Sequence, residues 1–359
     1  MKLYNQVLKD KSVLLLGPRF YGYCMRIKEQ LEKMGANVDY EETFIFLEDK
    51  RNNKNTIDWI FRNIRNPNYR KKHTKKILKL AKQKTYDILL VISVFSASPI
   101  VIDVLKQKNP NIKTYIYFWD AFSTWNFSYQ MKYFDYKYSF DYNDCVQYKK
   151  IGLRYLPLFW IPEQLCTGIN REYDIVHIGS LHPKYVSRAS VCSNIVKQCE
   201  EKGLKVFVYL VSDVKKDIRK MSFKQICKYL INKDYRKFAN EIMSLPNYDQ
   251  LVHSGSLSQE QVHLIEKKAR CILDVNIDRA GIGMRVIGAL ANGQKIITNN
   301  KYIVNEDFYS KANIDIINDK GDYCVDKEWL QQETTRINLD SLRIDNWICH
   351  ILDIQNDLR

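Results

Sequence analysis

Glycines and an arginine between residues 281 and 288 have the types and spacing of a small-anion site. Gly281 and Gly283 lie between a β-rich stretch and a helical pattern that starts near Met284, and Arg285 falls in the first helical turn. Glycines let a ligand approach the backbone, and the free N–H groups and dipole of a helix N-terminus favour an anion. A cation is unfavourable for that dipole, so Arg285 is better explained if its guanidinium grips an anion bound there. The alternative is a tight turn beside a surface arginine.

The spacing of these glycines matches neither common nucleotide fingerprint. The stretch is not GxxxxGK[ST], which excludes a P-loop, and as GxGxxG it lacks the third glycine. It also lies far from the first strand of the chain, where that fingerprint belongs. Any phosphate site here must therefore be of another type.

Three further groups of residues follow apolar stretches and could contribute to chemistry. Asp120 could act as a general base on a hydroxyl, or it could cap a helix. The loop from Gly17 to Gly22 offers Gly17, Arg19 and Tyr21 for a phosphate or an acceptor, with a surface arginine as the alternative. The third group suits diphosphate contact and consists of Gly179, His182, Lys184 and Arg188. His177 lies inside an apolar strand pattern and is interpreted as a satisfied core histidine.

The elements that must position these residues alternate between strands and helices. Continuous apolar strand patterns occur at residues 11–16, 87–92, 114–119, 174–179, 206–211, 271–277 and 295–298, with helical patterns between most of them. Such uninterrupted apolar strands indicate parallel sheets covered on both faces. The fold class is therefore α/β, with Rossmann-like sheets. Ligands of such sheets bind beyond the carboxyl ends of the strands, where the candidate residues lie.

A loss of periodicity between residues 160 and 172 marks a linker, which predicts two domains. We expect an N-terminal domain over residues 1–160, with a basic insertion at 50–84, and a C-terminal domain over 161–338. A final helical stretch, 339–359, is expected to pack back onto the first domain.

Composition restricts the classes of partner. The net charge of the 359 residues is +15, and residues 50–84 carry thirteen Lys or Arg against a single acid, Asp58. With its apolar residues, this basic segment suits an anionic membrane surface. A nucleic acid and a merely solvated helix face are the alternatives, but no DNA- or RNA-binding motif supports a nucleic acid. No apolar run of the sequence is long enough to span a bilayer.

The cysteines and acidic residues give no metal site. The nine cysteines are scattered without a CxxC pair, as expected of free thiols in a reducing cytoplasm. No DxD triplet occurs. We therefore expect no metal and no cofactor, and a cytoplasmic location.

Several stretches occur in the order found in one family of enzymes. They are YIYFWDAFS, FDYKYSFDYNDCVQYKKIGLRYLPLFW, DIVHIGSLHPKYVSR, ARCILDVNI and GIGMRVIGALANGQKIITNN. Together they resemble bacterial glycosyltransferases of lipopolysaccharide and capsular polysaccharide biosynthesis, which are related to spore-maturation glycosyltransferases. The resemblance implies a GT-B fold of two facing Rossmann-like domains. It also implies that the first domain binds a glycan acceptor and the second a nucleotide-sugar.

One residue departs from the pattern of that family. Relatives usually carry Glu three positions after the arginine, where related enzymes use it to hold the ribose of the donor, and this chain has Gly288. Positions i and i+3 share a helix face, so Gly288 should lie beside Arg285. Either the donor is unusual, another residue substitutes, or activity is weakened.

The expected function is metal-independent transfer of a sugar from a nucleotide-sugar to a bacterial surface glycan. The charge of the leaving diphosphate would be neutralised by Arg285, Lys184, Arg188 and helix N-termini. Peripheral attachment to the inner face of the membrane, through residues 50–84, would bring the enzyme to a lipid-linked acceptor. The alternative is a non-catalytic glycan- or nucleotide-binding protein on the same scaffold.

Overall fold

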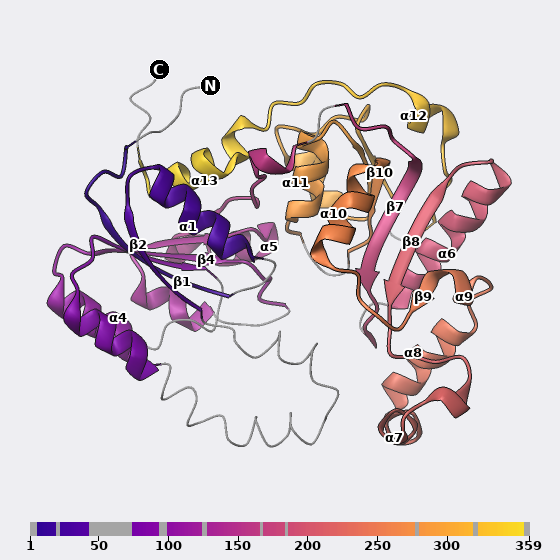
Figure 1. Ribbon diagram of the computed structural model, residues 1–359, viewed down its shortest axis with the longest axis horizontal. Helices are drawn as coiled ribbons and strands as arrows, with labels where there is room; N and C mark the ends of the chain where they lie inside the picture. Colours follow the sequence, from indigo (N-terminus) through magenta and orange to yellow (C-terminus); the bar gives the residue numbers. More distant parts are fainter. Residues whose placement is uncertain are drawn as a thin grey trace. The chain divides into compact units, whose positions relative to one another are not determined.

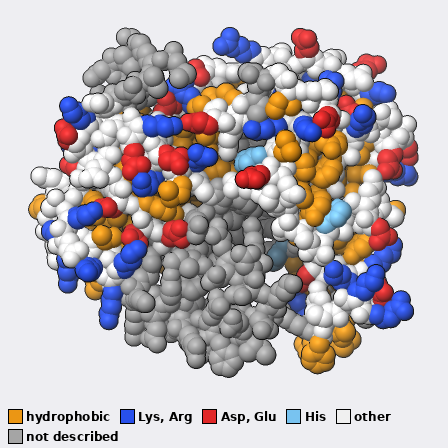
Figure 2. Space-filling model, in the orientation of Figure 1, with side chains coloured by type: hydrophobic (Ala, Val, Ile, Leu, Met, Phe, Trp, Pro, Cys, Tyr) orange, Lys and Arg blue, Asp and Glu red, His pale blue; other side chains and the backbone are white. Residues whose placement is uncertain are grey.

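The computed structural model describes residues 6–18, 22–42, 74–92, 99–123, 128–165, 168–183, 186–276, 280–318 and 322–354. The remaining residues are drawn in grey in Figure 1 and Figure 2. The chain divides into two compact units. The first unit comprises Met1–Phe159 and Asp340–Arg359, and the second comprises Trp160–Leu339.

A six-stranded parallel sheet forms the centre of the first unit, with strand order β2-β1-β3-β4-β5-β6. Its strands are β1 (Ser12–Gly17), β2 (Asn37–Glu42), β3 (Ile88–Ile92), β4 (Lys113–Phe118), β5 (Tyr136–Ser139) and β6 (Leu153–Tyr155). Its helices are α1 (Tyr23–Lys33), residues 74–83, α4 (Pro99–Lys108), α5 (Tyr142–Gln147) and α13 (Ile344–Ile351), with 3-10 turns η2 (Ser128–Tyr133), η3 (Lys149–Ile151) and η8 (Asp340–Leu342). The five residues of β3 are all buried, as its apolar sequence predicts for a central strand.

The C-terminal helix α13 belongs to the first unit (Figure 1). Its Trp347 is fully buried, donates from the indole N–H to the carbonyl oxygen of Pro157 over 3.0 Å, and packs edge-on against Tyr117. A buried indole of this kind contributes a large apolar area and still satisfies its polar atom. The helix is shorter than the stretch 339–359 expected from the sequence. It begins after Arg343 and ends before Leu352.

A second six-stranded parallel sheet has the order β12-β11-β10-β7-β8-β9. Its strands are β7 (Tyr173–Ser180), β8 (Val206–Val211), β9 (Val252–His253), β10 (Ala269–Asp274), β11 (Lys295–Thr298) and β12 (Ile314–Ile316). The helices are α6 (Val186–Glu201), α7 (Phe223–Ile231), α8 (Lys233–Met243), α9 (Tyr248–Leu251), α10 (Gln259–Lys267), α11 (Met284–Ala291) and α12 (Lys327–Gln331), with 3-10 turns η4 (Pro162–Gln164), η6 (Ile218–Lys220) and η7 (Lys301–Asn305).

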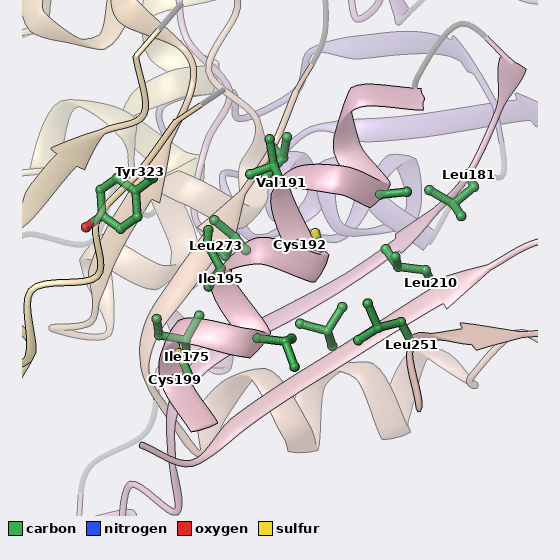
Figure 3. Close-up of a cluster of buried hydrophobic side chains, with 14 of the residues drawn as sticks. Ile175, Leu181, Val191, Cys192, Ile195, Cys199, Leu210, Leu251, Leu273 and Tyr323 are labelled. Carbon is green, nitrogen blue, oxygen red and sulfur yellow. The ribbon is translucent and has the colours of Figure 1, made fainter. Parts of the chain in front are cut away.

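The core of the second unit forms where α6 covers the sheet. Figure 3 shows side chains of α6, such as Cys192 and Ile195, beside side chains of the strands, such as Leu210 and Leu273. Cys192 is fully buried, and its burial raises the pKa of the thiol to about 12, so this cysteine behaves as an apolar core residue. The two parallel sheets with their helices confirm the predicted α/β class with Rossmann-like units.

Candidate functional site

The strand order of the second unit places one candidate site at its centre. Strands β8 and β9 lie on one side of β7, and β10, β11 and β12 lie on the other. The chain direction across the sheet therefore reverses between β7 and β10. In open α/β sheets this switch point, beyond the carboxyl ends of the strands, is where ligands bind.

Arg188 of α6 connects the ends of these two strands. Its Nε donates to the carbonyl oxygen of Val275, which follows β10, over 2.9 Å. Its Nη1 donates to the carbonyl oxygen of Ser180, at the end of β7, over 2.7 Å. The sequence predicted diphosphate contact for Arg188, whereas the structure shows these two donors committed to the backbone. Arg188 therefore holds the switch point together and contributes its charge from that fixed place.

His177 of β7 is buried beneath this switch point. Its Nδ1 lies 2.7 Å from the carbonyl oxygen of Leu273, and its Nε2 has no hydrogen-bond partner among the described residues. Burial, with the charges of Arg285 and Arg188, lowers the pKa of the imidazole to about 3. The ring is thus neutral at physiological pH, with Nδ1 as the donor and Nε2 as an unused acceptor. The interpretation as a satisfied core histidine holds for Nδ1 only.

Gly179 lies next to that unused acceptor. A Cβ at this position would be 2.9 Å from Nε2 of His177 and 3.4 Å from Nη1 of Arg188. Because residues i and i+2 of a strand share a face, only glycine leaves room here for the imidazole and the guanidinium together. The glycine, predicted for donor binding, thus has a packing role that is set by two nitrogen-bearing side chains.

The glycine-rich turn between β10 and α11 adds backbone donors to the same region. Gly283 is the N-cap of α11, and Met284 and Arg285 are the first two residues of the helix. A Cβ at Gly283 would meet no atom of the described residues within 4 Å. Glycine at the N-cap cannot supply the side-chain cap that Ser, Thr, Asp or Asn would give there. Free N–H groups at such an end form an anion site in combination with nearby cations.

Arg285 has a partner that the sequence did not reveal. Its Nε lies 2.8 Å from Oε1 of Glu266, near the end of α10, and its side chain is one-third exposed. Glu266 is largely buried in this ion pair. No motif marks Glu266 in the sequence, because the pairing depends on how α10 packs beside α11. A carboxylate is thus present near Arg285, although position 288 carries none.

Gly288 lies one turn further along α11. A Cβ added at Gly288 would meet no atom within 4 Å in the part of the chain that the structure describes. No side chain of those residues therefore fills the position where relatives are expected to carry Glu.

Asparagines complete the edge of the site. The side-chain amide of Asn300 donates to the carbonyl oxygen of Gly281 over 3.0 Å, and Oδ1 of Asn299 accepts from the backbone N–H of Asn276 over 2.7 Å. These bonds tie the turn before α11 to the ends of β10 and β11. Two more residues were predicted to bind the nucleotide-sugar. His182 is exposed, and Lys184 lies outside the described residues.

The candidate residues of the first unit form a separate group. Asp120 is half-buried two residues beyond β4, and the backbone N–H of Phe122 in the same loop donates to Oδ2 of Asp144 over 2.8 Å. Burial raises the pKa of Asp144 to about 6. Asp141 is the N-cap of α5, and its side chain accepts from the backbone N–H of Asp144. Asp144 thus orders the loop of the proposed base.

Gly17 ends β1, but its surroundings are those of a packing residue. A Cβ there would lie 2.5 Å from Sγ of Cys24 in α1 and 3.2 Å from Cβ of Ile92 in β3. The absence of a side chain lets α1 approach the sheet. Arg19 and Tyr21, predicted for the same loop, lie outside the described residues.

Comparison with known proteins supports the fold. No known protein family matches the sequence, and no curated protein matches it. A solved structure described as apo OtsA is similar, with a TM-score of 0.54 at 10% identity, over 97% of this chain and 100% of the other. The N-terminal domain of trehalose-6-phosphate phosphatase from Candida albicans gives a TM-score of 0.53 at 12% identity, over 98% and 99%. The chain has the GT-B fold class. At these identities the likeness concerns the fold alone.

Proposed function

We propose that the protein is a glycosyltransferase that moves a sugar from a nucleotide-sugar to a bacterial surface glycan such as lipopolysaccharide or a capsular polysaccharide. The observation that carries the proposal is the constellation at the β7–β10 switch point. There the start of α11, with glycine at its N-cap and Arg285 in its first turn, lies near the neutral His177 and the fixed charge of Arg188. The family resemblance of the sequence supports the same reaction.

In this proposal the second unit binds the nucleotide-sugar. The diphosphate lies at the start of α11, where the N–H groups of Met284 and Arg285 and the Arg285 guanidinium stabilise its charge. That charge grows as the bond to the sugar breaks, so donors aimed at the diphosphate lower the barrier. The sequence contains no DxD triplet, and these cationic and backbone groups take the role that a chelated metal would otherwise have.

The first unit binds the acceptor. Asp120 accepts the proton of the acceptor hydroxyl as that oxygen attacks the anomeric carbon, and the nucleoside diphosphate leaves with the electron pair of the broken bond. Asp144 positions the loop of Asp120 through the N–H of Phe122. The loop at Gly17, with Arg19 and Tyr21, contacts the acceptor or its phosphate.

The basic segment, residues 50–84, attaches the enzyme to the inner face of the membrane, where a lipid-linked acceptor would be found. Its net charge supports this, since each basic group near an anionic surface contributes about 1 kcal/mol. None of the helices in the described ranges is long and apolar enough to cross a bilayer. The attachment that we propose for this segment is peripheral.

Replacing Arg285 tests the donor site. We expect Arg285→Ala to lower kcat/KM for the nucleotide-sugar by about 100-fold or more, because removal of a single charge-stabilising donor has effects of this size. Calorimetry with UDP-, GDP-, CMP- and dTDP-sugars first identifies the donor, and a transfer or hydrolysis assay then measures turnover.

Arg270→Ala is the matched control for that experiment. Arg270 is an exposed arginine of β10 that also pairs with an acid, Asp174, at 3.6 Å. We expect its donor turnover to be unchanged, and circular dichroism should show both variants folded. If Arg285→Ala keeps nearly wild-type turnover, Arg285 does not bind the diphosphate as proposed.

A second candidate is a non-catalytic nucleotide- or glycan-binding protein. Gly288 favours it, because the carboxylate expected of a donor-ribose contact is missing there. Binding of a nucleotide-sugar without hydrolysis or transfer to any acceptor would support this candidate. Failure to bind any nucleotide-sugar would contradict the glycosyltransferase and the nucleotide-binding form of this candidate.

A further inference from the structure

The helix α7 exposes its apolar residues. Phe223 and Ile231 are more than four-fifths exposed, at 83% and 82%, and Leu230 is 63% exposed. These residues recur with Ile226 at the i, i+3, i+7 and i+8 spacing that places them along one stripe of the helix. A surface helix of a globular protein normally turns such a stripe toward the core. Here the stripe faces outward.

The orientation of α7 is fixed by its polar residues. A capping box at Ser222 starts the helix, and Nε2 of Gln225 donates to the carbonyl oxygen of Asp213 over 2.6 Å. The Tyr229 hydroxyl donates to Oδ1 of Asn240 in α8 over 2.6 Å. These bonds hold the polar side of α7 against the unit, so the outward stripe is a feature of the fold rather than of a freely rotating helix.

The neighbouring helix α8 shows the contrast. Its apolar residues Tyr235, Phe238 and Ile242 are buried in the core of the second unit. Helix α8 therefore anchors the pair, and α7 projects from it at the end of the unit (Figure 1). Figure 2 shows hydrophobic side chains gathered at this end, with Lys and Arg side chains close by.

The surroundings of the exposed stripe are strongly basic. Residues 213–237 contain nine Lys or Arg and three Asp, a net charge of +6 within 25 residues. The basic side chains Arg219, Lys220, Lys233 and Lys237 are exposed, whereas Nζ of Lys228 lies 3.8 Å from the centroid of the Tyr235 ring in α8. An apolar stripe rimmed by cations is complementary to a surface that is negatively charged outside and apolar beneath, which is the structure of an anionic bilayer.

We propose that α7 docks the second unit on an anionic phospholipid surface. At 1.5 Å per residue, its nine residues span only about 13 Å, so the helix lies in the plane of the headgroups and does not cross the bilayer. Phe223, Leu230 and Ile231 enter the acyl boundary, and the surrounding lysines and arginines contact the phosphates. This surface is distinct from residues 50–84, and it does not depend on the reaction proposed above.

Vesicle sedimentation of the full chain tests the proposal. We expect binding to vesicles of equimolar phosphatidylcholine and phosphatidylglycerol, and much weaker binding to phosphatidylcholine alone. Phe223→Ser combined with Ile231→Ser should lower the partition coefficient on the anionic vesicles about tenfold or more, because the apolar part of the contact is lost. Both side chains are exposed, so the fold should be retained.

Ile100→Ser combined with Ile151→Ser is the matched control. These two side chains are 54% and 51% exposed on the first unit and lie outside the stripe. We expect wild-type vesicle binding from this control and wild-type nucleotide binding from both double variants. The nucleotide arm separates failure of this proposal from failure of the proposed enzyme activity.

Three results would overturn the membrane proposal. The first is absence of binding to anionic vesicles, and the second is unchanged binding of the Phe223/Ile231 variant, which would assign membrane attachment elsewhere in the chain. The third is a change in oligomeric state of that variant, measured by sedimentation velocity, without a change in vesicle binding. That result would make a second copy of the chain the occupant of the stripe.

Discussion

The two units place a glycine at equivalent points of similar sheets but surround it with different chemistry. In the first unit the strand order reverses at β1, and in the second it reverses at β7. Gly17 ends β1 and Gly179 is the second-last residue of β7. A Cβ at Gly17 would meet sulfur and carbon, from Cys24 and Ile92, whereas at Gly179 it would meet nitrogens of His177 and Arg188.

This difference distinguishes an apolar switch point in the first unit from a polar one in the second. At Gly17 the space beside the strand end is occupied by buried apolar atoms that hold α1 against the sheet. At Gly179 the same kind of space holds an unused acceptor and a guanidinium, with Arg285 close enough to influence the histidine. One fold class therefore supports a packed strand end in one unit and a polar strand end in the other.

The largest effect on stability is expected at Gly17. Gly17→Ala would place a methyl carbon only 2.5 Å from Sγ of Cys24 and 3.2 Å from Cβ of Ile92, so one of these atoms must move. Overpacking of this kind costs about 1–3 kcal/mol. Urea unfolding followed by circular dichroism measures the loss.

Cys24→Ala provides the internal check on that prediction. If the sulfur is the obstacle, the alanine at position 17 should cost at least about 1 kcal/mol less in the Cys24→Ala background than alone. An equal cost in both backgrounds would show that the strand end is not limited by Cys24. That result would contradict the interpretation of Gly17 as a strand end limited by apolar packing against Cys24.

A second effect should appear as pH dependence from His177. The pKa of its imidazole is lowered to about 3 in the folded protein, mainly by burial, so the unfolded chain binds a proton below about pH 6.5 and the folded chain does not. Stability should fall as the pH is lowered through this window. Between about pH 8 and pH 5 the contribution is about 2 kcal/mol.

The variant His177→Asn isolates this contribution. Its side-chain amide can still donate to the carbonyl oxygen of Leu273, but it does not titrate. We expect its stability deficit relative to the wild type to shrink by about 2 kcal/mol between pH 8 and pH 5, because only the wild type loses the histidine term. A deficit that stays constant over this range would contradict a buried neutral imidazole at the switch point.

The parts of the molecule that were predictable are those set by local pattern. Continuous apolar strands, the cap of α11 at Gly283 and the approximate place of Arg285 follow from periodicity and glycine chemistry. The short β6, residues Leu153–Tyr155, is not among the predicted strands, because three residues give little periodicity.

The parts that were not predictable depend on packing between distant segments. Glu266 meets Arg285 only because α10 lies beside α11, and Nε2 of His177 is left unpaired only because of its neighbours in space. The sequence shows that residues 213–237 are basic, but not that α7 turns its apolar stripe outward. That orientation is set by Gln225 and Tyr229, whose partners are backbone and α8 atoms.

The smallest effect should come from Asp144 in the first unit, and its sign is opposite to that of His177. Burial raises the pKa of the Asp144 carboxyl to about 6, so above this pH the folded state carries a buried charge that the unfolded chain can solvate. Asp144→Asn removes the charge and keeps an oxygen for the N–H of Phe122. We expect a gain of about 1 kcal/mol in unfolding free energy at pH 8 that disappears near pH 4.

Urea unfolding at pH 8 and pH 4 tests whether the pH dependence of stability from Asp144 is opposite in sign to that from His177. A gain that is equal at both would mean that Asp144 stays ionised in the fold throughout, and a loss at pH 8 would mean that its charge stabilises the loop of Asp120. If the gain appears as expected, acid weakens the fold through the nitrogen-lined strand end of the second unit, while alkali weakens it through the carboxylate beside β4 and α5 of the first. The polar chemistry of the two units would then differ in the charge that each accepts, which is the difference required if one binds a diphosphate and the other accepts a proton.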